Sequence, residues 1–288
     1  MANLRDIRTR IKSVKNTRQI TRAMQLVAAS KMKRAQEKAQ GGRSYTFLLA
    51  QILVNLSGQE SIKNHPFFNR REVKKRGIAV VSTDKGLCGG LNANLFKKII
   101  SIKEDAVFIS IGRKGKQFLT RTQRPLLASF EVADLVPFHQ VRIVVDYMIE
   151  KFIAGEIDTV EVLYPEFINT LTQEATIAPI LPIHNLEDML VDLEKKGRIQ
   201  LPEKDPREII FEPSVRAILD EIPAIYAKQS VYQLILEARA SEHSARMVAM
   251  KSATDNASKF VDSLTLEYNK ARQAAITQEI LELAASAA

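Results

Sequence analysis

The two ends of this 288-residue chain are long stretches that contain no glycine and no proline. Residues 2–40 and 224–288 lack both, while all eleven Gly and all ten Pro fall between positions 41 and 223, where we expect the turns and strands. At ~1.5 Å per residue, the second stretch would form a helix roughly 100 Å long. A helix of that length cannot wrap one globular core, so it indicates a coiled coil, a membrane span or a repeat, and its charges exclude the span.

Apolar and small residues in the first stretch follow the alternating spacing of three and four that is typical of a coiled-coil seam. They are Leu4, Ile7, Ile11 and Val14, followed by Thr21, Met24, Ala28, Met32, Ala35 and Ala39. In the second stretch we expect a seam of small residues at Ala238, Ala245, Ala249, Ser252 and Asn256. A returning domain between the two stretches would make the pair antiparallel, with left-handed supercoiling. Two helices of an ordinary bundle are the alternative, but a third long helix is missing.

The middle of the chain alternates strand-like and helix-like segments. Short β-branched runs at Gly77–Thr83, Val107–Gly112, Thr159–Phe167 and Ala175–Ile183 predict strands, and Leu91–Lys103, Lys114–Arg121 and Phe138–Ile153 have helical spacing. A proline-punctuated stretch, Leu201–Pro213, leads into the last helix. The predicted fold is a central α/β layered domain carried by a long antiparallel two-helix coiled coil. The predicted segments are 1–60 for the first helix, 77–208 for the α/β domain and 209–288 for the last helix.

The net charge of +9 lies entirely in the first stretch. Residues 1–40 hold eleven Lys and Arg against Asp6 and Glu37, and the remaining residues balance at 31 basic and 31 acidic. Such a basic face predicts an acidic partner, which could be a protein, a nucleic acid or a membrane. An arginine-rich, acid-poor start is also typical of mitochondrial transit peptides. The helical pattern continues past residue 35, which disfavours that interpretation.

The segment Ser82–Asn92 is the most enzyme-like feature, a glycine-rich turn between a predicted strand and a predicted helix. It lacks both G-x-G-x-x-G and the Walker pattern, so Lys85 has no phosphate cradle and a structural turn is favoured. Cys88, the only cysteine, could be a nucleophile or a small buried residue, and no histidine is placed beside it by the sequence. The sequence therefore predicts no catalytic residue, no cofactor and no metal site.

The last helix carries polar residues among Ala, Met and Val. Glu242, Arg246, Asp255 and Asn256 are one group, and Gln273 and Thr277 form an i,i+4 pair. Composition leaves two interpretations open, a solvated face or hydrogen bonds to a surrounding partner. The tip from Ala274 to Ala288 has only Glu279 and Glu282 as charges, and a single apolar helix is unstable in water. We therefore expect other protein to surround this tip.

Three groups of motifs resemble the gamma subunits of F-type ATP synthases. The first runs from Ile11 to Arg34, with Asn16-Thr17, Ile20-Thr21, Ala23-Met24 and Val27-Ala28-Ala29-Ser30-Lys31-Met32. The second is Ser82-Thr83-Asp84-Lys85-Gly86-Leu87-Cys88-Gly89-Gly90-Leu91-Asn92. The third comprises Ser241–Lys251 and Asn269-Lys270-Ala271-Arg272-Gln273 through Ile276–Ile280. They follow the family's order and cover both ends and the first strand, whereas residues 113–210 carry little that is specific to the family.

The resemblance implies a rotor shaft that makes no bonds itself. In that family the coiled coil stands inside a ring of alpha and beta subunits, its foot is fixed with epsilon to the membrane c ring, and its rotation couples ion flow to ATP synthesis or hydrolysis. The basic helix would face acidic lever loops of beta. The resemblance places contacts to the alpha/beta hexamer at Met24, Arg246, Gln273 and Thr277, and contacts of the foot at Phe211 and Glu212.

The same resemblance implies one copy per complex and a peripheral place on the cytoplasmic face of a bacterial inner membrane. The chain departs from the family near its end, where Ser286-Ala287 stands in place of Gly-Ala, and it has no cysteine pair of the chloroplast type. Two other functions stay open on the residues alone. The first is a basic coiled-coil protein that binds nucleic acid through its basic arm, which would expose Lys and Arg without an apolar seam in that arm. The second is an α/β enzyme that uses the Lys85 loop, and its isolated chain would bind nucleotide.

Overall fold

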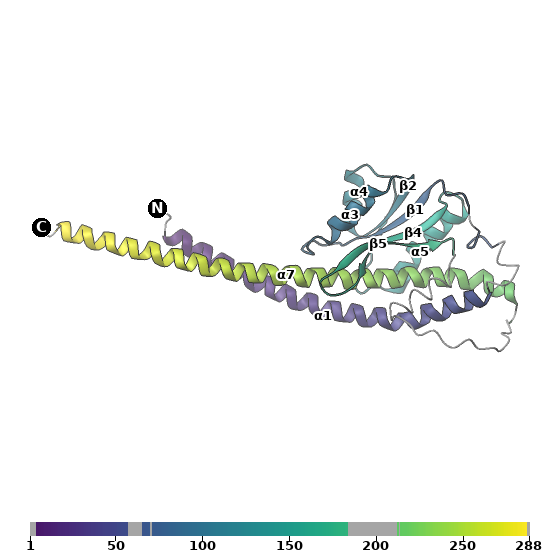
Figure 1. Cartoon of the computed structure of the whole chain (residues 1–288), viewed down its shortest axis with the longest axis horizontal. Coiled ribbons are helices and arrows are strands. Elements are labelled where there is room, and N and C mark those ends of the chain that lie inside the picture. Colours follow the sequence, from purple (N-terminus) through teal and green to yellow (C-terminus); the bar gives the residue numbers. More distant parts are fainter. Residues whose placement is uncertain (1–3, 57–64, 70, 184–211, 213, 287–288) are drawn as a thin grey trace. The chain divides into compact units, whose positions relative to one another are not determined.

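The computed structural model describes residues 4–56, 65–69, 71–183, 212 and 214–286 (Figure 1). Two compact units divide the chain. The helix-pair unit combines residues 1–30 with residues 246–288, and the sheet unit contains residues 31–245. Two long helices belong to both units: α1 spans Leu4–Leu56 and α7 spans Val215–Ser286.

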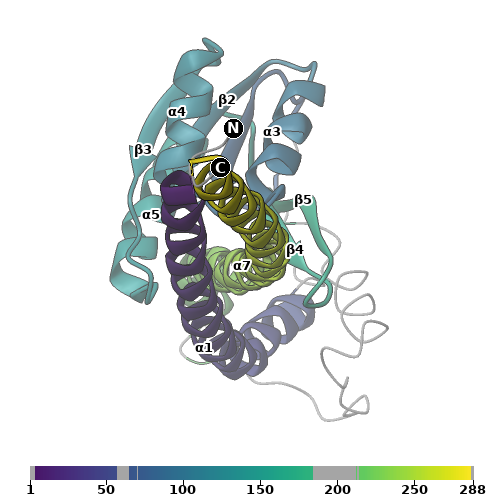
Figure 2. The same ribbon diagram turned by 90° about the vertical axis from the view of Figure 1, so that its left-hand side faces the viewer.

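The helix-pair unit consists of the first half of α1 and the last part of α7, which lie side by side in Figures 1 and 2. The predicted seam of α1 is confirmed, because Ile7, Thr21 and Ala28 are buried and Leu4, Ile11, Val14 and Met24 are half-buried between exposed neighbours. Thr21 and Thr254 share a hydrogen bond of 2.8 Å between their hydroxyl oxygens. The helices run antiparallel, as the sequence predicts.

The predicted seam of α7 is wrong in its second half. Ser252 and Asn256 are exposed, and the buried positions are Met250, Ala257 and Val261. Thr254, Leu264, Tyr268 and Ala271 continue this stripe as half-buried residues, so the spacing again alternates between three and four. The error has a simple cause: the prediction selects Ser252 and Asn256 for small or polar side chains, whereas the helix buries the apolar residues Met250, Ala257 and Val261.

Helix α1 continues through Gly41 and Gly42, inside the predicted first segment of 1–60, although glycines generally favour turns. A Cβ atom on Gly42 would lie 2.8 Å from Oε1 of Gln233, so glycine allows α7 to come close at this point. Gln233 also donates a hydrogen bond to the carbonyl of Ala39. Tertiary packing therefore overrides the low helix propensity of the glycine pair.

Pro223 is the second exception, because it lies inside α7. A proline in a helix removes one backbone hydrogen bond and costs about 3 kcal/mol. Leu219, Tyr226 and Ala227 around it are buried in the core of the sheet unit. Burial of this apolar face offsets the cost, and the helix starts before the proline rather than after it.

The sheet unit has five strands in the order β3-β2-β1-β4-β5. They are β1 Arg76–Val81, β2 Ala106–Ile111, β3 Leu126–Phe130, β4 Thr159–Phe167 and β5 Gln173–Leu181. Strands β1 to β4 are parallel, and β5 pairs antiparallel with β4 at the edge. The chain moves from β1 through β2 to β3 on one side and then places β4 on the other side of β1. The carboxyl ends of β1 and β4 are therefore a topological switch point.

Helices cover both faces of this sheet (Figure 1). Helices α3, Leu91–Ser101, and α4, Arg113–Arg121, pack on one face around a cluster that includes Phe108, Leu95 and Leu119. Helix α5, Phe138–Ile153, packs on the other face together with parts of α1 and α7. That second cluster includes Ile109 and Val162 of the sheet and Ile235 of α7. The predicted layered α/β domain is confirmed.

The sequence predicts the strands well with one omission. Four predicted strands and three predicted helices correspond to observed elements within a few residues at each end. Strand β3, Leu-Leu-Ala-Ser-Phe, is missing from the prediction. It is a five-residue edge strand in which half-buried and exposed residues alternate, so its apolar signal is short and weak. Most of the predicted stretch Leu201–Pro213 lies outside the described residues.

Candidate functional site

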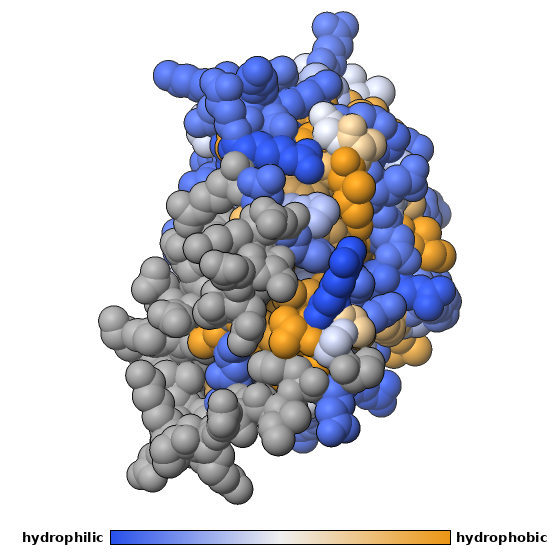
Figure 3. Space-filling model, turned by 90° about the vertical axis from the view of Figure 1, so that its right-hand side faces the viewer, coloured by the Kyte–Doolittle hydropathy of each residue, from blue (hydrophilic) through white to orange (hydrophobic). Residues whose placement is uncertain are grey.

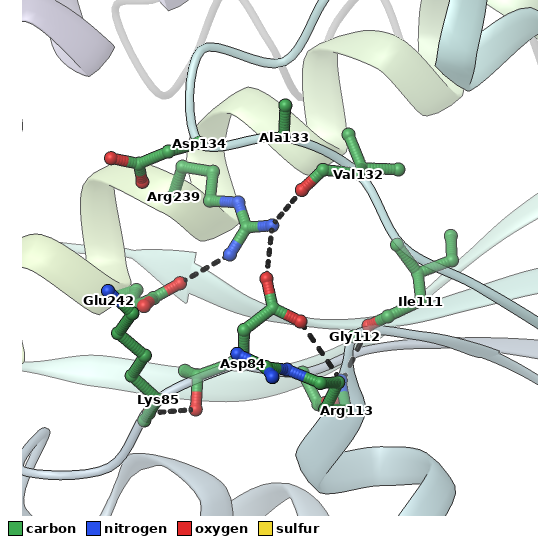
Figure 4. A network of polar contacts seen from close by, with 12 residues as sticks. Asp84, Lys85, Ile111, Gly112, Arg113, Val132, Ala133, Asp134, Arg239 and Glu242 are labelled. Carbon is green, nitrogen blue, oxygen red and sulfur yellow. Dashed lines mark hydrogen bonds and ion pairs between the residues drawn. The ribbon is translucent and has the colours of Figure 1, made fainter.

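A network of charged side chains centres on Arg239 of α7, within the sheet unit (Figure 4). The guanidinium donates to Oε2 of Glu242 at 2.7 Å, to the carbonyl of Val132 at 2.8 Å and to Oδ2 of Asp84 at 3.4 Å. Asp84 follows β1 in the glycine-rich turn, and Val132 follows β3. One arginine thus joins the long helix to two loops at the carboxyl edge of the sheet.

Arg239 is buried, with 4% of its surface exposed. Burial by itself would lower the pKa of Arg239, but the negative charge and hydrogen bond of Glu242, followed by the charges of Asp84 and Asp134, raise the pKa overall. The guanidinium therefore stays charged in the interior. Removal of any one of these carboxylates would leave positive charge less compensated in a region of low dielectric.

The loop of residues 131–137, between β3 and α5, contacts both long helices. Lys31 of α1 and His243 of α7 each lie against one carboxylate oxygen of Asp134, at 2.5 and 3.2 Å. Lys38, two turns after Lys31, donates to the carbonyls of Leu135 and Val136 at 2.7 and 3.1 Å. Burial would raise the pKa of Asp134, but the hydrogen bond from Lys31 and the charges of His243, Lys31 and Arg239 lower it overall.

The turn Ser82–Asn92 is held by its own hydrogen bonds. The amide of Asn92 donates to Oγ1 of Thr83 at 2.7 Å and to Sγ of Cys88 at 3.4 Å, and Cys88 is buried. Gly112 packs against this turn with φ of +104°, and a Cβ atom there would come within 2.3 Å of the Ser82 carbonyl. Asp84 accepts a hydrogen bond from the backbone of Arg113 at 3.0 Å. These contacts favour the interpretation of the segment as a structural turn.

Two further kinds of feature, metal-binding clusters and membrane-spanning helices, can be assessed in the described part of the chain. No cluster of three or more His, Cys, Asp and Glu side chains that could bind a metal ion occurs among the described residues. Among those same residues, no helix combines the length and the apolar character that crossing a bilayer requires.

The outer faces of the helix-pair unit carry the features expected of a surface that contacts other protein. Exposed basic residues follow the first half of α1, namely Arg5, Arg8, Arg10, Lys12, Lys15 and Arg22. Large apolar side chains are exposed on the same unit: Ile20, Leu26 and Val27 on α1, and Phe260, Leu266, Ile276, Ile280 and Leu281 on α7. Such a run of exposed apolar side chains is typical of an interaction surface.

The residues predicted as partner contacts have different surroundings. Gln273 and Thr277 are exposed, and the hydroxyl of Thr277 donates to the carbonyl of Gln273 at 3.0 Å. Met24 and Arg246 are half-buried in the helix-pair unit, and Glu212 is exposed. Phe211 lies outside the described residues. The structure therefore connects Gln273 and Thr277 by a hydrogen bond within α7. The contact roles of all six residues stay predictions.

The sequence prediction missed Arg239 and Asp134, and it named Glu242 and Lys31 without their partners. A signal for Arg239 was present: the arginine and Glu242 stand three residues apart within an Ala- and Ser-rich run. A charge pair at that spacing places both side chains on one face of the helix and indicates an ion pair between them. Asp134 carried no comparable signal, because its partners come from helices far away in the sequence.

The face shown in Figure 3 mixes charged and apolar side chains, with the apolar ones in small groups. The sheet unit also has exposed apolar residues, including Tyr45 and Leu48 on α1 and Ile153 on α5. They are scattered over several elements, and scattered apolar residues are ordinary on a protein surface.

Comparison with known proteins identifies close relatives over the whole chain. The family model described as ATP synthase matches residues 3–288. An ATP synthase gamma chain of Opitutus terrae is 52% identical, with 99% of this chain and 98% of the relative covered. One of Akkermansia muciniphila is 45% identical, with 98% and 97% covered.

Solved structures share the fold. A chain of the Euglena gracilis mitochondrial ATP synthase, in a structure of OSCP, F1 and c ring, aligns with a TM-score of 0.67 at 18% identity, covering 98% of this chain and 93% of that one. A chain from the rotor of the same enzyme gives a TM-score of 0.63 at 17% identity, with 95% and 98% covered.

Proposed function

The chain belongs to the ATP synthase gamma chain family, and from this premise we propose that it is the central rotor shaft of the enzyme. It transmits torque from the ion-driven c ring in the membrane to the catalytic alpha/beta hexamer, during ATP synthesis or hydrolysis. The observation that supports this role is the antiparallel helix pair, whose narrow seam is buried while basic and apolar side chains point outward. A surface of that kind suits a helix pair enclosed by other protein.

The chain acts as a non-catalytic subunit, and the nucleotide sites belong to its partners. Support comes from the turn Ser82–Asn92, where phosphate would be expected in an α/β fold. Its polar groups are directed at one another, and Asp84 is directed at Arg239 and at the backbone of Arg113. A carboxylate at this place also repels phosphate.

Contacts to the hexamer are made by Met24, Arg246, Gln273 and Thr277. Gln273 and Thr277 support this most directly, because both are exposed near the end of α7, beside exposed Ile276 and Ile280. The basic residues of α1 face acidic loops of beta, where charge complementarity gives attraction without fixing one rotational position.

The foot of the shaft contacts the c ring and the epsilon subunit through Phe211 and Glu212, and Glu212 is exposed. The chain is present in one copy per complex. It associates peripherally, through its partners, with the cytoplasmic face of a bacterial inner membrane. Support for the bacterial setting is that the similar gamma chains of Opitutus terrae and Akkermansia muciniphila come from bacteria.

Replacement of both Arg246 and Gln273 by Ala tests the contact assignment in the assembled complex. We expect ATP hydrolysis coupled to rotation to fall, while the circular dichroism and melting of the isolated chain stay those of the wild type. Arg121→Ala with Gln117→Ala is the matched control, since it removes the same two residue types from exposed positions on α4. Hydrolysis equal to that of the control complex would refute the two contacts.

A further inference from the structure

The loop of residues 131–137 is the place where the sheet unit holds both long helices at once. From α1 it receives Lys31 and Lys38, and from α7 it receives Arg239 and His243. Loop 131–137 and these four side chains all belong to the sheet unit. Asp134 is the meeting point, because one carboxylate oxygen accepts from Lys31 of α1 and the other lies against His243 of α7.

The seam beside the loop is built of small side chains. Ala35 and Ala39 of α1 and Ala238 of α7 are examples, and small side chains interlock less than large ones. One hydrogen bond, from Gln233 of α7 to the carbonyl of Ala39, already joins the two helices there. Hydrogen bonds between charged groups are directional and short in range, so those of the loop add a further constraint on both helix positions.

Arg239 makes displacement of α7 costly. Its guanidinium is shared among the carboxylate of Glu242 on the same helix, Asp84 after β1 and the carbonyl of Val132 after β3. A shift by one helical turn would leave Asp84 and the carbonyl of Val132 without this cation. A buried ion pair of this kind contributes little net stability, but removal of one partner is strongly unfavourable.

We propose that loop 131–137 is a mechanical clamp that fixes α1 and α7 to each other and to the sheet, with Asp134 and Arg239 as its positioning residues. The clamp lets the sheet unit and the helices it holds turn as one body, so that torque is not lost to slippage. This inference rests on the proposed function as a rotor shaft. Its structural part, the fixing of two helices through one loop, does not.

Hydrogen exchange on the full chain tests the structural part. Asp134→Asn keeps the size of the side chain and removes its charge, and Glu131→Gln is the matched control from an exposed position of the same loop. We expect Asp134→Asn to lose roughly two- to fivefold of amide protection around Lys31–Lys38 and also around Arg239–His243, because Asp134 and Lys31 are partly exposed and solvent screens their pairing. Unchanged protection, or loss in only one helix, would overturn the clamp.

ATP-driven proton pumping by the reconstituted complex tests the mechanical part. With Asp134→Asn or Arg239→Met, the ratio of protons pumped to ATP hydrolysed should fall while hydrolysis continues. Arg239→Lys should recover part of this ratio, because lysine restores the positive charge but not the several donors of the planar guanidinium. A loosened clamp with an unchanged ratio would overturn the mechanical role. Pumping that persists when the chain is omitted from assembly would instead overturn the proposed shaft function and leave the exchange result valid.

Discussion

The sheet and the helix pair are stabilised in different ways. Strands β1 and β2 are buried along almost their whole length, and apolar clusters fill both faces of the sheet. The helix-pair unit instead buries a single stripe, whose buried residues on the described part of α1 in this unit are Ile7, Thr21 and Ala28. The comparison indicates that the sheet unit supplies its own stability, whereas the helix pair has apolar surface left over for other protein.

The largest expected difference between the two regions comes from removing one apolar side chain in each. Phe108 of β2 is fully buried, so Phe108→Ala should lower the free energy of unfolding by about 3–5 kcal/mol. Val261 of the helix pair is 6% exposed, and Val261→Ala should cost only about 1 kcal/mol. Urea unfolding of the isolated chain, followed by circular dichroism, measures both.

Two outcomes would break the comparison. Equal losses for the two variants would show that the seam is packed as tightly as the sheet. A loss for Phe108→Ala below that of Val261→Ala would reverse the assignment of the stable region. Leu127→Ala is a suitable control, because Leu127 lies in β3 and is exposed.

The sequence predicts both regions because each has a strong local signal. The seam of α1 from Leu4 to Ala39 follows from spacing alone, and strands such as Thr159–Phe167 follow from β-branched runs between turn residues. Local preference alone fails where neighbours decide the structure. Helix α1 continues through Gly41-Gly42 and α7 contains Pro223, both inside the predicted helical segments 1–60 and 209–288, because packing against the other helix or the core outweighs local preference.

The candidate site shows the same limit more clearly. The sequence identified Glu242 and the turn containing Asp84, but not the arginine that joins them. The contact of Asp134 with Lys31 spans 103 positions in the chain, and that of His243 depends on how α7 lies on the loop. Long-range polar pairs have no local period, so a single sequence gives no spacing from which to derive them.

The buried side chain of Tyr226, in the sheet unit, should make the free energy of unfolding depend on pH, an effect of intermediate size. Burial raises the pKa of Tyr226 from 10.0 to about 12, so the folded chain holds this proton more tightly than the unfolded chain. The stability that this proton contributes is fully present below pH 10.0 and is lost as the pH rises toward 12. Over that range the free energy of unfolding should fall by roughly 2 kcal/mol. Urea unfolding of the wild type and of Tyr226→Phe across this range measures the difference, and the variant should show a flatter pH dependence.

A spectroscopic titration should distinguish Tyr226 from the other tyrosines, as a smaller effect. The chain has six tyrosines, and absorbance at alkaline pH should show one of them ionising about 2 units later than an exposed tyrosine. Loss of this late step in Tyr226→Phe would assign it. A late step that remains unchanged in the variant would show that Tyr226 is not the tyrosine responsible for it.

The smallest expected effect concerns the polar pair in the seam, Thr21 and Thr254. Each hydroxyl has one proton, which it can give either to the other threonine or to a carbonyl of its own helix, that of Arg18 at 3.0 Å for Thr21 and that of Met250 at 2.8 Å for Thr254, so the remaining hydroxyl keeps an acceptor when the other is replaced. Thr21→Val and Thr254→Val should each cost less than about 1 kcal/mol, and the double variant should recover most of the loss because two valines pack well. A double-mutant cycle on thermal unfolding measures this coupling. Strictly additive costs would show that the bond of 2.8 Å between the helices contributes nothing, and the alignment of the pair would then depend on apolar side chains alone.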